Sequence, residues 1–288
     1  MAKITFSPSM KRIGIFYNPK LFKSIQKLKE RVEFLQKNGY IISLLESQKR
    51  KRLQGISYVE NFTKENIELL IVLGGDGTIL LASKLVLKEN IPLLGFNHGK
   101  LGFLSECEKH EFEPVFSEIQ KGAYEIEERM VIECITVSNS GKKNFALNDC
   151  VLYKGKYPKM LTFKILDDNE YLFDIEADGI IVSTPTGSTG YNISAGGSIV
   201  FPHTNVLLLT PINPHNQFVK PFIFSAEKKI SIQYIKGNEK IYVAIDGENV
   251  ETMKKYEQIA IEKSSYTSKF IKLPDKTFAK IVREKFID

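Results

Sequence analysis

Three glycines and one aspartate follow one of the most apolar segments of the chain. The apolar run Ile67–Leu73 is followed directly by the segment Gly74–Thr78, which reads Gly-Gly-Asp-Gly-Thr. Glycines leave backbone N–H groups open to a ligand, and a helix that begins here adds unpaired N–H groups and the positive end of its dipole. We therefore expect a loop that binds a phosphate donor, made of Gly74, Gly75, Gly77 and Thr78.

Asp76 distinguishes this loop from the familiar phosphate loops. The spacing fits neither the Walker loop nor the dinucleotide-binding Gly-x-Gly-x-x-Gly pattern. A carboxylate is ionised at neutral pH, so it repels phosphate unless a cation or a hydroxyl proton lies between them. Asp76 is a candidate base for an alcohol, a candidate magnesium ligand, or both. The plain alternative is a tight turn in which Asp76 only caps the helix.

A second segment, Asp178–Gly197, is rich in glycine and hydroxyl side chains. It follows a short apolar run and offers many N–H and O–H donors without positive charge, a composition that fits phosphate or ribose. Tyr191 offers a flat face for a nucleobase. The alternative is an ordinary loop.

The first hundred residues alternate between strand and helix patterns, which predicts a doubly wound, Rossmann-like α/β domain. Glycine-rich turns of such sheets bind ligands at the carboxyl ends of the strands. The predicted strands are 12–17, 40–45, 67–73 and 91–95, and the predicted helices are 21–38 and 78–88.

Past Glu111 the pattern becomes that of short β-branched or aromatic strands separated by turn residues. We predict an α/β domain over residues 1–110 and a β-rich domain over 111–267, with a C-terminal segment at about 268–288 that ends in a helical stretch and packs back onto the first domain. The predicted strands of the second domain are 131–138, 144–153, 161–166, 171–177, 180–183, 206–210, 230–234 and 240–245.

Composition excludes several classes of protein. The 40 basic and 34 acidic residues give a net charge of +6, which mildly favours anionic ligands and is too small to indicate a nucleic-acid partner. No apolar run approaches the ~18 residues of a membrane span, so we expect a soluble cytoplasmic protein. Cys107, Cys134 and Cys150 fit neither a disulfide framework nor a zinc site, and we expect small buried residues. The basic run Lys49–Arg52 is interpreted as a solvated loop.

Five motifs in a fixed order make the chain resemble the NAD kinase family. They are Gly74–Thr78, Gly95–Leu104, Asn148-Asp149, Thr184–Gly197 and Thr210–His215, and together they cover about residues 70 to 250. The first motif also occurs in diacylglycerol-type lipid kinases, but the later ones are typical of NAD kinases.

The resemblance implies an enzyme that transfers the γ-phosphoryl group of ATP, or of polyphosphate in some bacterial members, to the 2′-hydroxyl of the adenosine ribose of NAD. It also implies Mg²⁺ carried with the phosphate donor, and a homodimer or homotetramer. By the same analogy Asp76 is the proton acceptor, and the residues that bind NAD are Asp76, Gly77, Asn148, Asp149, Lys159, Asp178, Thr189, Gly190, Tyr191, Asn192 and Ser194.

Some positions depart from the family pattern. Asp149 and Gly190 stand where Glu and Ala are usual, and Glu248 adds a charge beside the expected dinucleotide. His98 and His215 have no partner at metal-ligand spacing and stay unassigned. Two other functions remain open, a lipid kinase that shares the Gly-Gly-Asp-Gly-Thr turn and a non-catalytic sensor of NAD(H) or NADP(H). The sequence predicts neither a nucleic-acid nor a membrane partner.

Overall fold

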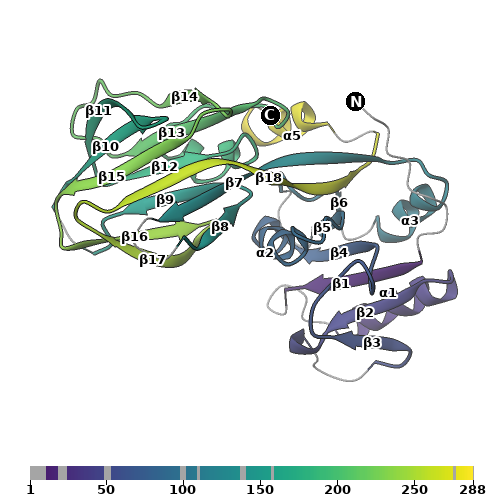
Figure 1. Ribbon diagram of the computed structural model, residues 1–288. Coiled ribbons are helices and arrows are strands. Elements are labelled where there is room, and N and C mark those ends of the chain that lie inside the picture. Colours follow the sequence, from purple (N-terminus) through teal and green to yellow (C-terminus); the bar gives the residue numbers. More distant parts are fainter. Residues whose placement is uncertain are drawn as a thin grey trace. The chain divides into compact units, whose positions relative to one another are not determined.

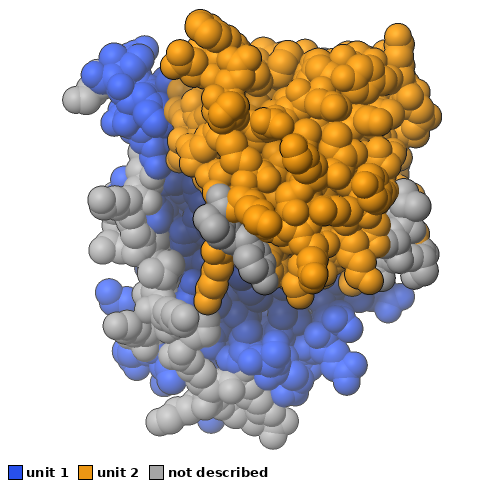
Figure 2. Space-filling model, turned by 90° about the vertical axis from the view of Figure 1, so that its left-hand side faces the viewer, with its two compact units in different colours: residues 1–128, 268–288 blue, residues 129–267 orange. Residues whose placement is uncertain are grey.

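The computed structural model describes residues 11–18, 25–48, 53–97, 102–108, 111–136, 141–156, 159–274 and 277–287. The chain divides into two compact units, which are coloured separately in Figure 2. Unit 1 comprises residues 1–128 and 268–288, and unit 2 comprises residues 129–267. The chain passes from one unit to the other within β7 (Glu125–Thr136) and again within β18 (Gln258–Lys272).

A parallel sheet forms the centre of unit 1 (Figure 1). Its strands lie in the order β3-β2-β1-β4-β5, which is the doubly wound order and confirms the predicted α/β class. The C-terminal end of β18 continues this sheet beside β5, where Phe270 pairs with Leu93 in parallel. The strands are β1 (Arg12–Tyr17), β2 (Ile41–Leu45), β3 (Ile56–Val59), β4 (Leu69–Gly74), β5 (Leu93–Asn97) and the short β6 (Cys107–Glu108), which pairs with β5.

Helices cover this sheet because each carries an apolar stripe. α1 (Ile25–Lys37) buries Leu28, Val32 and Leu35 against the strands. The other helices of unit 1 are α2 (Asp76–Val86), α3 (Phe112–Gln120) and α5 (Phe278–Phe286), with a short 3₁₀ turn, η1 (Glu46–Gln48), after β2.

The first division between the units lies after Glu128, later than the boundary expected near residue 110. The reason is α3, whose apolar face belongs to the core of unit 1. Phe112 and Phe116 of this helix pack with Phe96 of β5, and the Phe96 and Phe112 ring centroids lie 4.9 Å apart. Residues 111–128 thus fold with the α/β unit.

Unit 2 is built from antiparallel strands (Figure 1). A six-stranded sheet has the order β14-β13-β12-β9-β16-β17, and a second group has the order β11-β10-β15-β18. The strands are β8 (Lys143–Ala146), β9 (Asp149–Tyr153), β10 (Leu161–Asp167), β11 (Glu170–Ala177), β12 (Gly179–Ser183), β13 (Val206–Ile212), β14 (Phe222–Ser225), β15 (Ile230–Lys236), β16 (Lys240–Ile245) and β17 (Glu248–Lys254).

The two groups of strands share one apolar core, as in a sandwich of sheets. Phe163 and Ile232 from the second group and Val182 and Val243 from the six-stranded sheet are fully buried in the same cluster. The helical segments among the described residues of unit 2 are two short turns, η2 (Thr186–Thr189) and α4 (Tyr191–Ser194). This confirms the β-rich character expected for the second half of the chain. Across the described ranges no helix has both the length and the hydropathy needed to cross a membrane.

Candidate functional site

Asp76 is the first residue of α2 and follows the fully buried strand β4. The residue at the cap position is Gly75, which makes no side-chain cap hydrogen bond. The Asp76 carboxylate instead accepts hydrogen bonds from a neighbouring loop, with Phe103 N–H at 2.8 Å from Oδ2 and Leu104 N–H at 3.2 Å from Oδ1. Asp76 therefore does not act as the helix cap, and two backbone donors fix the direction of its carboxylate.

Gly102 makes this contact possible. A Cβ atom at position 102 would lie 1.9 Å from Asp76 Oδ1, far inside van der Waals contact. The Gly-Phe-Leu sequence at 102–104 thus has a specific physical purpose, since its glycine lets the loop approach and its next two N–H groups bind the carboxylate. These residues lie in a motif that carries the family resemblance, but the sequence does not reveal their contact with Asp76.

The glycine loop lies at the carboxyl edge of the parallel sheet. Gly74 pairs with Asn97, the last residue of β5, so the two strands end side by side. Asn97 is buried at this edge, where α/β sheets bind their ligands. At a helix start the first N–H groups lack partners within the helix and, with the positive end of the dipole, favour an anion. In α2 the Thr78 N–H is bonded to the Gly75 carbonyl at 2.9 Å, so the N–H groups before Thr78 are the candidates for such a contact. Gly77 is exposed and Gly75 half-buried, while Thr78 is buried behind the loop.

Asn148 and Asp149 lie at one end of β9 in unit 2. Asp149 pairs with Ser183 of β12, and the Asn148 carbonyl accepts the N–H of Thr184 at 2.9 Å. The Asn148 Oδ1 atom is buried and has no hydrogen-bond partner among the described residues. A Cβ atom at position 190 would lie 3.4 Å from Asn148 Nδ2 and 3.8 Å from Asp149 Oδ2. The structure therefore brings three predicted NAD-binding residues together: Asn148, Asp149 and Gly190.

Most hydroxyl groups of the Thr184–Gly197 segment point into the protein. The Thr184 hydroxyl donates to the Leu147 carbonyl at 2.6 Å, and the Ser188 hydroxyl bonds both backbone groups of Val200. Gly187 lets the segment pack against the backbone of Asn148, because a Cβ atom at position 187 would come within 2.2 Å of the Asn148 carbonyl oxygen. Several of the hydroxyl groups expected to contact a ligand are thus used inside the protein, and Thr184 holds the segment Leu147–Asn148.

Asn192 is fully buried, and its side chain is used inside unit 2. Its amide donates to the carbonyls of Ser188 and Ser198, both at 3.0 Å, and its oxygen accepts the Thr210 hydroxyl at 2.7 Å. A direct contact between this side chain and NAD therefore conflicts with its burial. The neighbouring candidates differ, since Tyr191 and Ser194 are exposed on α4, and Thr189 and Gly190 are half-buried.

Asp178 lies at the opposite end of the same strand pair. Its carboxylate forms an ion pair with Lys154 Nζ at 2.5 Å and accepts from Asn213 Nδ2 at 3.3 Å. Lys154 and Asp149 are five residues apart, so these two ends are roughly 17 Å apart along the strand. Only an elongated ligand could contact both. Lys154 and Asn213 were not predicted from the sequence, because their contacts depend on the register of β9, β12 and β13.

The remaining polar candidates are more peripheral. Lys159 is exposed, directly after two residues outside the described ranges. The exposed ring of His215 lies 3.9 Å from the Glu176 carboxylate, and the backbone N–H of His215 donates to the Glu176 carbonyl at 2.9 Å. Glu248 begins β17 and is exposed. His98 and the run Lys49–Arg52 lie outside the described residues.

A metal site made by the protein alone requires several suitable side chains close together. The described residues contain no group of three or more His, Cys, Asp and Glu side chains that could hold an ion. Mg²⁺ in phosphoryl-transfer sites needs only one or two carboxylates, because substrate phosphates and water supply the other ligands. Asp76, a carboxylate at the start of α2, fits that requirement. All three cysteines are buried, as expected, and none of them is in a disulfide.

Family models match both units of the chain. The ATP-NAD kinase N-terminal domain matches residues 13–124, and the ATP-NAD kinase C-terminal domain matches residues 147–273. The NAD kinase of Carboxydothermus hydrogenoformans is 36% identical over 269 residues, which cover 93% of this chain and 94% of that protein. The NAD kinase of Heliobacterium modesticaldum is 38% identical over 221 residues, or 76% of this chain and 78% of that protein.

Two solved structures share the fold. Yeast NADH kinase in complex with NADH superposes with a TM-score of 0.84 at 25% identity, over 96% of this chain and 87% of the yeast chain. An NAD kinase from Archaeoglobus fulgidus in complex with ATP superposes with a TM-score of 0.71 at 27% identity, over 91% of this chain and 94% of the archaeal chain. With family models over both halves and a relative matched over nearly its whole length, the chain belongs to the NAD kinase family.

Proposed function

We propose that this chain transfers the γ-phosphoryl group of ATP to the 2′-hydroxyl of the adenosine ribose of NAD and so produces NADP. The observation that carries this proposal is the Asp76 carboxylate, held by the N–H groups of Phe103 and Leu104 at the start of α2. A fixed carboxylate beside a helix N-terminus combines a proton acceptor with a phosphate-binding site, which is what this reaction needs. Membership of the NAD kinase family, matched over both units, favours this function over a lipid kinase.

Each proposed step uses residues of this chain. Asp76 accepts the proton of the 2′-hydroxyl group while the oxygen of that hydroxyl forms a bond to the γ-phosphorus. The bond between the γ-phosphorus and the β–γ bridging oxygen breaks, which releases ADP. Backbone N–H groups at Gly74–Thr78 bind the phosphates, so that the enzyme contributes mainly positioning and charge neutralisation. A divalent cation that arrives with ATP would be held by the phosphates together with Asp76, and it would neutralise their charge.

Unit 2 supplies most of the residues proposed to bind NAD, and Asp76 and Gly77 of unit 1 complete the set. Asn148 and Asp149 hold ribose hydroxyl groups, and Asp178 contacts the nicotinamide end, roughly 17 Å away along the strand pair. This separation supports an extended dinucleotide. Thr189, Gly190, Tyr191 and Ser194 line the same pocket, and Lys159 contacts the pyrophosphate. For Asn192 we propose a supporting role, because its side chain is bonded inside the protein.

The deciding experiment incubates the purified protein with NAD, ATP and Mg²⁺ and measures NADP. We expect Asp76→Asn to lower kcat by at least about 100-fold, because a positioned base contributes that much or more to the rate. The variant should unfold at the same temperature as the wild type. Asp174→Asn is the matched control, since Asp174 is exposed on β11 and we expect wild-type kcat.

Near-normal activity of Asp76→Asn would remove Asp76 from the role of base. NAD binding by the wild type without any NADP would instead favour the sensor. The same preparation serves to compare ATP with polyphosphate, NAD with NADH, and to measure the mass of the proposed homodimer or homotetramer. A cytoplasmic location stays a prediction.

A further inference from the structure

A tight turn on unit 2 carries a carboxylate that the turn itself does not need. Ile245 pairs with Glu248, so Asp246 and Gly247 form a two-residue loop between β16 and β17. Both have positive φ angles, 49° and 81°. Such loops are type I′ turns, which accept Asn-Gly as readily as Asp-Gly. The conformation therefore explains the glycine but not the negative charge at position 246.

The Asp246 carboxylate binds the backbone of another segment. Its Oδ1 atom accepts the N–H groups of Asn148 at 2.8 Å and Asp149 at 3.1 Å, and its Oδ2 atom accepts the N–H of Leu147 at 3.0 Å. The Asp246 N–H donates in return to the Asp149 carbonyl at 3.0 Å. One side chain thus satisfies three successive backbone donors, and both of its oxygens take part.

Those three residues lie where the strand structure is interrupted. β8 ends at Ala146 and β9 begins at Asp149, so the N–H groups between them lack a place in a strand ladder. The carbonyl side of the same segment is held by the hydroxyl-rich loop, since Thr184 bonds the carbonyl oxygens of both Leu147 and Asn148. Asp246 supplies the matching contacts on the N–H side. The segment is therefore held from both sides by polar contacts.

We propose that Asp246 is a positioning residue for NAD, and that its carboxylate fixes the backbone from which Asn148 and Asp149 reach the ribose. This inference rests on the proposed function, in which those two residues hold ribose hydroxyl groups. Hydrogen bonds from N–H groups to a carboxylate are about twice as strong as those to a neutral acceptor. Charge at position 246 therefore strengthens a contact that the turn alone would not require.

Two substitutions remove the carboxylate and keep the turn. Asp246→Asn suits a type I′ turn but presents one oxygen, and its NH₂ group then faces a backbone donor. Asp246→Gly tolerates the positive φ and removes every acceptor. We expect KM for NAD to rise about tenfold or more in Asp246→Asn and further in Asp246→Gly, while KM for ATP stays unchanged.

Glu68 provides the matched control. Its carboxylate also accepts two backbone N–H groups, those of Lys11 and Arg12, both at 3.0 Å, but it lies at the other end of β4 from the glycine loop. Glu68→Gln and Glu68→Ala remove a carboxylate of the same kind, so we expect them to change stability and to leave KM for NAD unchanged. In an Asn148→Ala background, Asp246→Asn should add little to KM, because both changes act through the same contact.

We also expect faster hydrogen exchange at the Asn148 and Asp149 amides in Asp246→Asn. Faster exchange supports the inference only if KM for NAD rises as well. A folded Asp246→Asn enzyme with wild-type KM for NAD would overturn it, and so would equal rises in KM for NAD and ATP. Asp246→Asn decides the question if Asp246→Gly does not fold. A wild-type protein that makes no NADP would overturn the proposed function instead, and hydrogen exchange would still show whether Asp246 holds the segment.

Discussion

Asp76 depends on its neighbours more than its own motif suggests. The carboxylate is oriented by Phe103 and Leu104, which follow it by 27 and 28 positions in the chain. A base that must meet a single hydroxyl group gains from such fixed orientation, since misplacement by about 1 Å can cost about 100-fold in rate. The loop that contains Gly102 is therefore as much a part of the proposed site as the glycine-rich turn.

Substitution of Gly102 tests that dependence at the scale of one methyl group. In Gly102→Ala the new Cβ would lie 1.9 Å from Asp76 Oδ1, so the carboxylate must move or the loop must withdraw. We expect kcat to fall by about 100-fold. The double variant Gly102→Ala/Asp76→Asn should be no slower than Asp76→Asn alone, because both changes remove the same function. Wild-type kcat in Gly102→Ala would show that the contact has no catalytic consequence.

Individual site residues were predictable to different degrees. Asp76, Asn148 and Asp149 could be proposed as site residues from the sequence because their residue types and motif order carry the resemblance. The direction of a side chain could not be found in this way. Asn192 and the hydroxyls of Thr184 and Ser188 belong to the same motif, yet they bond to buried backbone and side-chain groups of unit 2. Composition shows that donors are present but not which way they face.

At the scale of elements, α5 supports the loop that orients Asp76. Phe103 packs between two aromatic side chains of this helix, with ring centroids 5.9 Å from Phe278 and 5.7 Å from Phe286. Lys285 Nζ lies 4.7 Å from the centre of the Phe103 ring. Because the Phe103 N–H donates to Asp76, the packing of α5 against the Phe103 ring helps to hold the carboxylate of the proposed base in place.

Removal of these aromatic contacts should therefore affect catalysis. We expect Phe278→Ala/Phe286→Ala to lower kcat by about tenfold, since each aromatic pair contributes about 0.5–1.5 kcal/mol beyond its buried area. Steady-state kinetics and thermal unfolding would be measured together. Phe218→Ala is the control, because Phe218 lies on unit 2 with 79% of its surface exposed. If kcat stays at the wild-type value, α5 does not act on the loop.

Apolar periodicity predicted the longer strands of unit 1, and the predicted helix at 78–88 corresponds to α2. The short strands β3 and β6 and the helix α3 were not predicted. The predicted strand at 144–153 was wrong, because it is two strands, β8 and β9, separated at Leu147 and Asn148. The interruption is stabilised by Asp246, almost a hundred residues further along the chain. A local pattern cannot reveal a break that a distant carboxylate maintains.

At the scale of the whole molecule, unit 1 is completed by both ends of the described chain. Ile271 of β18 is buried in the same apolar cluster as Ile13 and Ile15 of β1. Polar contacts reinforce this closure, as Glu106 forms an ion pair with Lys272 and accepts the Leu273 N–H at 2.8 Å. Folding of the α/β unit therefore requires residues that follow the whole of unit 2 in the sequence.

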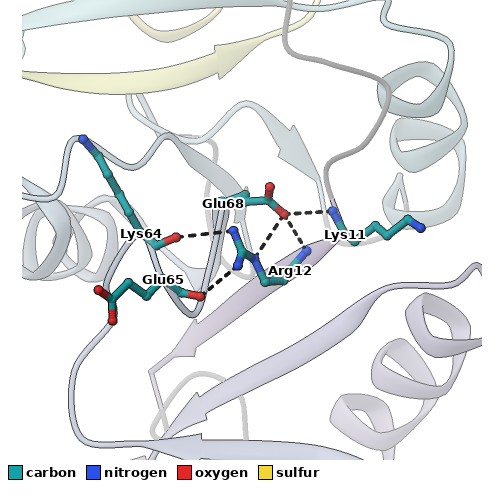
Figure 3. Close-up of polar contacts among 5 residues, drawn as sticks. All are labelled: Lys11, Arg12, Lys64, Glu65 and Glu68. Atoms are coloured by element: carbon teal, nitrogen blue, oxygen red, sulfur yellow. Dashed lines mark hydrogen bonds and ion pairs between the residues drawn. The ribbon is translucent and has the colours of Figure 1, made fainter.

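Stability against acid provides a test at this scale, through the Glu68 cluster shown in Figure 3. Burial raises the pKa of Glu68, but hydrogen bonds from Lys11 and Arg12 and the charge of Arg12 outweigh it, so the pKa lies below its ordinary value of 4.5. The Arg12 guanidinium also donates to the carbonyls of Lys64 and Glu65, which ties β1 to the segment before β4. The ionised form of Glu68 is thus favoured by folding.

A carboxyl group with a lowered pKa stabilises the folded state above its unfolded pKa and loses that effect as the pH falls through its folded pKa. We expect the free energy of unfolding of Glu68→Gln to lie below that of the wild type at pH 7, by at most about 1 kcal/mol because the pair is partly exposed. Urea unfolding at pH 7, 5, 4 and 3 should show this difference intact down to about pH 5 and shrinking below it, as wild-type Glu68 becomes protonated. A difference that stays constant to pH 3, or grows on acidification, would show that ionised Glu68 does not stabilise the fold.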